Sequence, residues 1–132
     1  MDVYLCGNPL LPEDALPLRL LPRLRRAFPA LRFRELDPTE DVPEGVPLLV
    51  VDTVQGIAAV TVFRDLDAFL QERRVSLHDA DLGFTLRLMQ KAGRLGPVTI
   101  VGVPQGAPDG EAFAQLRASL AALSGQDRPT SP

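Results

Sequence analysis

One run of residues constrains the fold more than any other: Val46–Val51, VPLLVV, the most hydrophobic stretch of the chain. A short, unbroken apolar run bounded by turn-forming residues is typical of a buried strand. Strands that are buried on both faces occur mainly in parallel sheets, where helices cover the sheet on either side. The run therefore predicts a central strand of an α/β sheet, with Asp52 at its carboxyl end.

Further strands and helices are expected to alternate along the chain. The expected strands are Asp2–Gly7, Leu31–Leu36 at the margin of the sheet, Ala58–Phe63 and Pro97–Val103. The expected helices are Asp14–Ala27, a short helix or turn at Asp65–Arg74, Val75–Gly93 and Glu111–Leu123. This alternation predicts one three-layer α/β domain over residues 1–123, a twisted, mostly parallel sheet of about five strands with helices on both faces. Residues 124–132 are expected to form a disordered tail.

Two of these helices carry specific local signals. Asp14 is expected to cap the first helix, and Pro22 to kink or break it, because proline lacks a backbone N–H. In the helix Val75–Gly93, Ser76 is the expected N-cap and Gly93 the expected stop. The expected apolar stripe of this helix is Leu82, Leu86 and Met89, widened by Phe84 and Leu88.

The composition argues against several classes of protein. A chain of 132 residues that is 45% hydrophobic is expected to form one globular domain, and its net charge of −3 argues against nucleic acid as the main partner. No apolar run approaches the ~20 residues of a membrane helix, and the N-terminus does not resemble a signal peptide. The single cysteine, Cys6, is expected to be a core residue, which fits a reducing cytoplasm. A monomer is expected.

Polar residues that could bind a metal follow the expected strands. Asn8, Glu13 and Asp14 come after the first strand, and Asp52 ends the central one. His78, the only histidine, begins a later helix. Ligands bind at the carboxyl ends of the strands in such sheets, so these residues are expected to share one edge. Two carboxylates and an imidazole suit a divalent metal with open positions.

Each of these residues also has a structural interpretation. Glu13 and Asp14 suit an acidic helix start, and His78 suits a helix start that faces water. Asp52 is harder to explain structurally, because a carboxylate beside a buried apolar run is costly unless it is exposed or paired. Other site classes lack their motifs: the chain has no GxGxxG, P-loop, GxSxG or CxxC, and a single histidine excludes HExxH.

Four motifs in order resemble the hydrogenase maturation endopeptidases, which process the large subunit of NiFe hydrogenases. The motifs are GN-PLL-P-ED-ALPLRLL, LLVVDTV, SLHDADLGFTL and PVTIVGVPQ, and the resemblance covers nearly the whole chain except its tail. It implies a twisted sheet between helices, in agreement with the pattern above. The residues that match the family's functional positions are the metal ligands Asp14, Asp52 and His78, the Gly-Asn turn Gly7 and Asn8, and Glu13 as the first of an acidic pair.

The resemblance implies a protease that has neither a Ser or Cys nucleophile nor a catalytic metal of its own. Asp14, Asp52 and His78 would dock on nickel already installed in the hydrogenase large-subunit precursor. A C-terminal extension of the precursor would then be removed by hydrolysis, with the nickel as template or Lewis acid. Nickel is thus expected as cargo of the substrate, and the precursor as the partner.

The chain departs from the family pattern at three places. Leu5 and Pro17 stand where glycines are usual. The segment Asp37–Gly45, DPTEDVPEG, replaces a Gly-rich turn and short helix, which indicates a reduced groove for the substrate tail. A protein that binds a hydrogenase subunit without cutting it is therefore the first alternative.

A receiver-like phosphoacceptor domain is the second alternative. Asp52 would accept the phosphoryl group, and Glu13 and Asp14 would hold Mg²⁺. Such domains need a lysine near the end of the last strand, where this chain has GVPQG. The only lysine, Lys91, lies in the expected helix Val75–Gly93.

Overall fold

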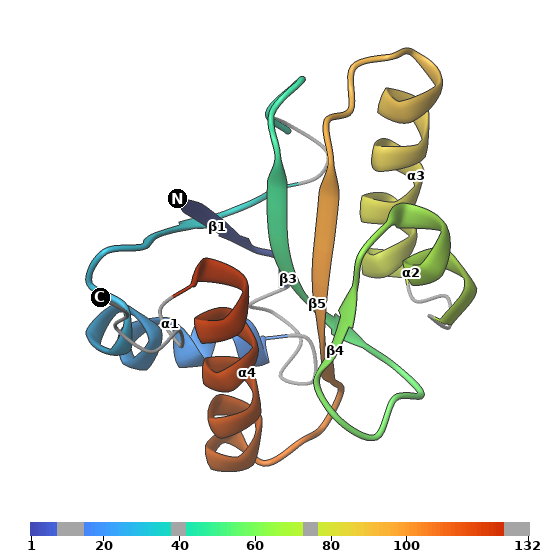
Figure 1. Ribbon diagram of the computed structural model, residues 1–132. Coiled ribbons are helices and arrows are strands. Elements are labelled where there is room, and N and C mark those ends of the chain that lie inside the picture. The colour runs from blue at the N-terminus through green and yellow to red at the C-terminus, as the bar shows by residue number, and fades with distance from the viewer. Residues whose placement is uncertain (8–14, 38–41, 73–76, 126–132) are drawn as a thin grey trace.

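The computed structural model describes residues 1–7, 15–37, 42–72 and 77–125, with the backbone alone at residues 72 and 77–81. Five strands and four helices alternate within these ranges (Figure 1). In chain order they are β1 (Asp2–Leu5), α1 (Leu16–Ala27), β2 (Arg32–Glu35), β3 (Leu48–Val54), β4 (Thr61–Phe63), α2 (Leu66–Glu72), α3 (Leu77–Lys91), β5 (Val98–Pro104) and α4 (Asp109–Ser124). Each expected strand and helix is present, although most of their ends are shifted.

The five strands form one mixed sheet in the order β2-β1-β3-β5-β4. Strands β1, β2, β3 and β5 are parallel, and β4 runs antiparallel to β5 at one edge. All seven residues of β3 are buried, and β2 forms the other edge. The central position predicted for the VPLLVV run and the marginal position predicted for Leu31–Leu36 are both confirmed.

Helices cover both faces of the sheet, which confirms the three-layer domain (Figure 1). On one face, α1 and α4 pack over a core that includes Leu20, Leu116 and Val51. On the other face, α2 and α3 pack over a second core that includes Phe69 and Leu86. Within the described ranges, every helix is too short or too polar to cross a bilayer.

The direction of the elements defines two edges of the sheet. Strands β3 and β5 run downward in Figure 1, and the lower ends of α3 and α4 are their N-termini. The carboxyl ends of the parallel strands therefore lie at the same edge as the starts of these helices. Any site built from strand ends and helix starts belongs to this carboxyl edge.

Helix α1 differs from its prediction at two positions. Its N-cap is Ala15, which makes no side-chain capping bond, so the prediction that Asp14 caps the helix is wrong. The helix also continues through Pro22, so of the kink or break predicted there, the break is absent. Leu20 and Leu24, on either side of Pro22, are fully buried in the core. Their burial stabilises the helical path and offsets the hydrogen bond that proline cannot make.

Helix α3 confirms its predicted end but not its full apolar stripe. Gly93 has a φ of 72°, the left-handed conformation typical of a residue that stops a helix. Leu82 and Leu86 are fully buried, whereas Phe84 is 67% exposed and Leu88 is 52% exposed. With 3.6 residues per turn, positions two apart lie about 200° apart, so Phe84 lies on the side opposite Leu82. The predicted widening of the stripe is wrong.

The C-terminal segment falls partly outside the described residues. Helix α4 extends to Ser124, and Gly125 caps it in the left-handed conformation with a φ of 78°. The predicted disordered tail, 124–132, otherwise lies beyond the described ranges, as does part of the segment Asp37–Gly45.

Candidate functional site at the carboxyl edge

Asp52 lies inside β3 rather than after it. The strand extends to Val54, so the prediction that Asp52 ends the central strand is wrong by two residues. Strand β1 stops earlier: Leu5 is paired with Val51, and the N–H of Cys6 donates to the carbonyl of Val51 at 2.8 Å. Because β3 extends further towards the carboxyl edge than β1, Asp52 is the first residue of the central strand beyond its pairing with β1.

The carboxylate of Asp52 is buried and held in one orientation. Its exposed fraction is 0%, and its Oδ1 accepts a hydrogen bond from the N–H of Thr53 at 2.9 Å. Asp52 is two residues from Val50 and from Val54, so all three side chains lie on the same face of the strand. That face is covered by α2 and α3. A buried carboxylate costs stability that an apolar residue would not. Asp52 is therefore the strongest candidate functional residue in the described part of the chain.

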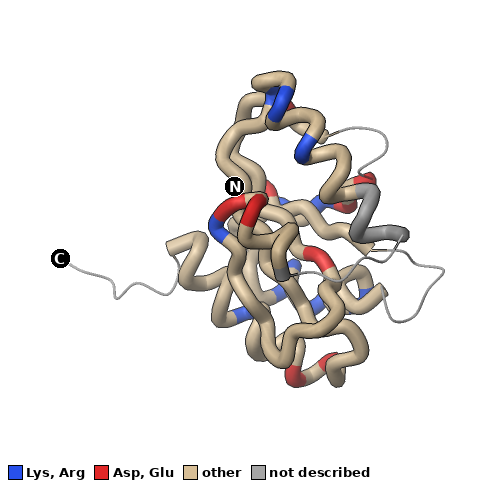
Figure 2. Tube along the Cα trace, turned by 90° about the vertical axis from the view of Figure 1, so that its right-hand side faces the viewer, with Lys and Arg blue, Asp and Glu red and all other residues tan. Residues whose placement is uncertain are grey.

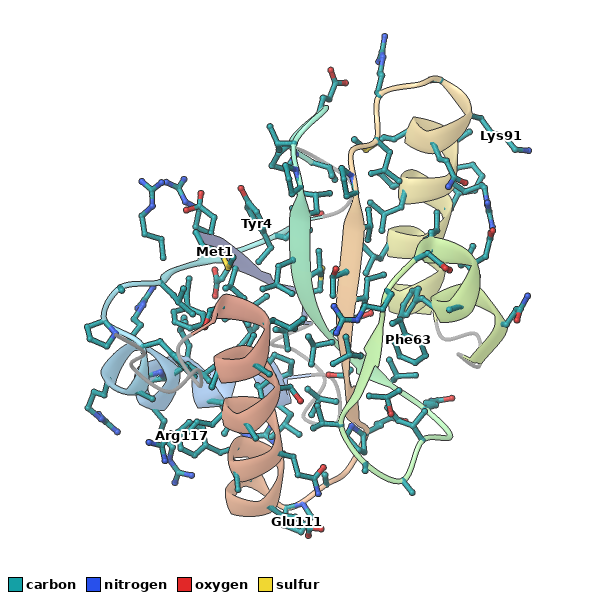
Figure 3. The ribbon with its side chains drawn as sticks, in the orientation of Figure 1. Met1, Tyr4, Phe63, Lys91, Glu111 and Arg117 are labelled. Carbon is teal, nitrogen blue, oxygen red and sulfur yellow. The ribbon has the colours of Figure 1, made fainter. Side chains whose placement is uncertain are left out.

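An apolar wall stands beside Asp52 on the same face. The register pairs Asp52 with Gly102 of β5. A Cβ atom at Gly102 would lie 2.9 Å from Cε2 of Phe63 and 3.0 Å from Cγ2 of Val54. Figure 3 shows Phe63 between the sheet and α2. Because Gly102 has no side chain, the ring of Phe63 and the side chain of Val54 can pack against β5 next to the carboxylate of Asp52.

Thr53 presents its side chain to the opposite face, where α1 and α4 pack. It is 2% exposed, and its hydroxyl has no hydrogen-bond partner among the described residues. Buried polar groups are normally hydrogen-bonded, so this hydroxyl is a cost to stability. Sequence reasoning missed Thr53, because threonine is common in strands and the run TV after Asp52 carries no polar pattern.

We expect Thr53→Val to raise the free energy of unfolding by about 1 kcal/mol, because it replaces an unpartnered buried hydroxyl with a methyl group of similar shape. Thr61→Val is the matched control. The Thr61 hydroxyl donates to the Ala59 carbonyl at 2.9 Å, so its loss should not stabilise the protein. Urea unfolding of both variants measures the difference. A Thr53→Val protein less stable than Thr61→Val would contradict the assignment.

His78 is placed at the same edge and on the same face as Asp52. Helix α3 begins at Leu77, so the backbone of His78 lies in its first turn, as predicted. This helix covers the face toward which Asp52 points. Gly7 follows β1 at the carboxyl edge. The side chain of His78 and the whole of Asn8, Glu13 and Asp14 lie outside what the structure describes.

A second acidic residue at this edge has a structural partner. Asp109 begins α4, and its two carboxylate oxygens accept hydrogen bonds from Arg19 of α1 at 3.1 and 3.2 Å. The hydrogen bond from Arg19 is the largest cause of the lowered pKa of Asp109, and burial opposes it. Asp109 is therefore engaged in joining α1 to α4.

An open pocket of about 300 Å³ lies where the turn after β3 meets the loop after β5. Its lining includes Ile57, Ala58, Pro104, Gly106 and Gln115. The Oε1 atom of Gln115 accepts a hydrogen bond from the N–H of Val60 at 2.8 Å, which ties the start of β4 to α4. The walls of the pocket combine small residues with the polar side chains of Gln105, Glu111 and Gln115, and an extended peptide segment could bind to such a mixed surface.

Comparison with known proteins adds evidence at the level of the fold. The sequence matches no family model and no curated protein. Among solved structures, the hydrogenase maturating endopeptidase HybD from E. coli matches with a TM-score of 0.65 and 19% sequence identity, over 96% of this chain and 93% of HybD. This chain has the fold of a hydrogenase maturating endopeptidase. An uncharacterized protein from Wolinella succinogenes matches with a TM-score of 0.53 and 14% identity, over 96% of this chain and 95% of that protein.

The HybD-like fold confirms, over nearly the whole chain, the fold that the resemblance of the four motifs implied. It does not by itself assign chemistry to particular residues. Among side chains that the structure describes, no group of three His, Cys, Asp or Glu residues could hold a metal ion. Of the predicted ligands, only Asp52 has a described side chain, so the trio with Asp14 and His78 stays a prediction.

Proposed function

We propose that this protein is an endopeptidase that removes a C-terminal extension from a NiFe hydrogenase large-subunit precursor after nickel insertion. The observation that carries the proposal is a buried, hydrogen-bonded carboxylate, Asp52, near the carboxyl end of the central strand of a HybD-like fold. Ligands of open α/β sheets bind at this edge. The start of α3, with His78, supports the same location.

In this proposal, Asp14, Asp52 and His78 dock on the nickel that the precursor carries. Nickel is then substrate cargo, and it can position and polarise the peptide bond that is cut. Oδ1 of Asp52 is already oriented by the N–H of Thr53, so this ligand needs no reorientation on docking. Because Asp52 is fully buried, nickel reaches it only when the residues that cover it are displaced.

The pocket between Ile57 and Gly106 is the proposed place for the peptide that leads into the cleaved bond. It adjoins the ends of β3 and β5, and the alanine, glycine and proline residues among its walls leave room for backbone. This placement compensates for the short segment Asp37–Gly45, from which a reduced groove was expected.

The topology argues against the receiver-like alternative. Receiver domains have the doubly wound strand order 2-1-3-4-5. Here β4 lies outside β5 and runs antiparallel to it. The non-cutting binder shares the fold and the edge with the protease, so only a cleavage experiment separates these two functions.

The experiment is intact-mass analysis of a large-subunit precursor mixed with this protein, with and without nickel in the precursor. We expect loss of a C-terminal fragment from the nickel-loaded precursor alone. Unchanged masses with co-elution of the two proteins would identify the non-cutting binder. Equal cleavage of both precursors would overturn nickel docking, and neither cleavage nor co-elution would overturn the proposed function.

A further inference from the structure

Helix α1 is strongly basic in an acidic chain. It contains four arginines and no acidic residue, although the chain as a whole has a net charge of −3. On the side of the molecule with α2 and α3, acidic and basic residues are interspersed (Figure 2), and Arg87 pairs with Asp67 at 2.6 Å. A helix with the charge of α1 attracts negatively charged groups even when the net charge of the protein is negative.

An open groove of about 460 Å³ lies beside this basic helix, between the end of α1 and the outer side of α4. Ala27 and Phe28 line the groove from α1, and Phe113, Arg117 and three alanines line it from α4. Phe28 is almost fully buried, whereas Phe113 is only partly buried. The groove therefore offers an aromatic ring and small apolar side chains to an apolar group of a partner.

Arginines surround this apolar centre. Arg117 is part of the lining, and Figure 3 shows it on the side of α4 that faces α1. The guanidinium carbon of Arg23 lies 6.0 Å from the centroid of the Phe113 ring. Arg26 follows Arg23 by about one helical turn, on the same side of α1. An apolar centre with positive charges beside it suits an apolar residue that is flanked by carboxylates.

Structural roles account for only part of this positive charge. Arg19 is held by Asp109, with 3.1 Å between its Nη2 and Oδ1 of the carboxylate. Arg26 and Arg117 are both exposed, and no carboxylate in the described ranges forms an ion pair with either. Arg26 lies in the last turn of α1, where a cation offsets the helix dipole, whereas Arg117 lies in the middle of α4 and has no such role. Its guanidinium group is available to a partner.

We propose that this groove binds an acidic peptide segment of a partner protein, with an apolar side chain in the groove and carboxylates on Arg23, Arg26 and Arg117. Guanidinium groups bind carboxylates through two parallel hydrogen bonds, so arginines select acidic segments. A nucleic acid or an anionic membrane fits less well, because the net charge of −3 repels an extended polyanion. The inference does not rest on the proposed function, because Asp52 lies on the opposite face of the sheet from α1 and α4.

Fluorescence anisotropy of a labelled peptide tests the proposal. The probe is a synthetic peptide with a leucine and a phenylalanine flanked by glutamates, titrated with this protein. We expect saturable binding with a Kd of about 10–100 μM, which weakens as salt is added because exposed ion pairs are screened. The same peptide with lysine in place of glutamate, or with glycine in place of its apolar residues, should bind at least about tenfold more weakly.

Variants of the protein locate the bound peptide. Arg26→Glu and Arg117→Glu should each weaken binding about tenfold, because an attractive contact becomes repulsive. Arg64→Glu, the same charge change between β4 and α2, should leave binding unchanged. Ala118 is exposed and lines the groove, so the longer side chain of Ala118→Gln should block it. Ala122→Gln is the matched control, because Ala122 is exposed on the same helix but outside the lining.

Several results would overturn the proposal, once circular dichroism and thermal melts have checked that each variant is folded. One is the absence of saturable binding up to about 1 mM protein. Others are equal binding of the lysine or glycine peptide, and wild-type binding by Arg117→Glu or by Ala118→Gln. Tighter binding of single-stranded DNA or of phosphatidylserine vesicles than of the acidic peptide would overturn it too, and would assign the basic surface to that polyanion.

Discussion

Asp52→Asn is expected to leave the protein folded and to reduce precursor processing at least about a hundredfold, which corresponds to roughly 2.7 kcal/mol of lost transition-state stabilisation. Asparagine has the shape of aspartate, and its Oδ1 can still accept the hydrogen bond from the N–H of Thr53. Only the negative charge is lost. Because a fully buried charge costs stability, its removal should leave the free energy of unfolding unchanged or raise it.

Asp2→Asn is the matched control for this prediction. It makes the same substitution, aspartate to asparagine, at the opposite, amino edge of the sheet. There, Oδ1 of Asp2 lies 2.8 Å from Nε of Arg32. Processing by Asp2→Asn should equal that of the wild type. Time courses by mass spectrometry measure processing, and urea unfolding measures stability. Wild-type processing by Asp52→Asn would remove Asp52 from the docking site, whereas an unfolded variant would make it a structural residue.

The sheet could be predicted from the sequence because its central strand comes from an unbroken run of apolar residues. Such a run is stable only when it is buried on both faces. Four residues of the predicted run Val46–Val51 lie in β3, and the Gly93 stop was predicted from one residue with a special backbone preference. Both are local signals. The end of β3 is not local, because Thr53 and Val54 are held by pairing with Val103 and Pro104 of β5, far along the chain.

The errors have one physical origin, which is tertiary packing. Helix α1 continues through Pro22 because buried leucines on both sides of it hold the helix on the sheet. Phe84 and Leu88 were assigned to the core because they are apolar, but the core beneath α3 is already filled. The antiparallel direction of β4 depends on its pairing with β5, which no pattern inside Ala58–Phe63 encodes.

The candidate site was partly accessible to sequence reasoning. Asp52 was found because a charge that follows a buried run demands an explanation, and its burial strengthens that reasoning. The turn that starts α3 at Leu77 likewise agrees with the position predicted for His78. Thr53 emerged only from the structure, since its unusual feature is an unpartnered hydroxyl and not its residue type.

Gly96→Ala is expected to lower the free energy of unfolding by about 2 kcal/mol or more, since overpacking against backbone cannot be relieved by a side-chain rotation. A Cβ atom at Gly96 would lie 2.8 Å from the carbonyl carbon of Val46 and 2.9 Å from its nitrogen, and would clash with its oxygen. The two segments run side by side where they enter β3 and β5: the N–H of Leu48 donates to the carbonyl of Pro97 at 2.8 Å. An added methyl group must push these segments apart.

Gly110→Ala is the matched control, because a Cβ atom at Gly110 in the first turn of α4 would meet nothing within 4 Å. Alanine is the better helix former, so this variant should be as stable as the wild type or more stable, by up to about 1 kcal/mol. Thermal melts and urea unfolding compare the two variants. If Gly96→Ala is as stable as Gly110→Ala, the close approach of the two segments is not a constraint on the fold.

Gly96 and Asp52 together separate stability from activity. Gly96 lies at the amino edge, far along β3 and β5 from the proposed docking site. Below its melting transition, Gly96→Ala should therefore process the precursor at the wild-type rate, while Asp52→Asn stays folded and fails to process it. Loss of processing by folded Gly96→Ala would mean that the reaction depends on the geometry of the whole sheet. The functional site would then extend beyond the carboxyl edge.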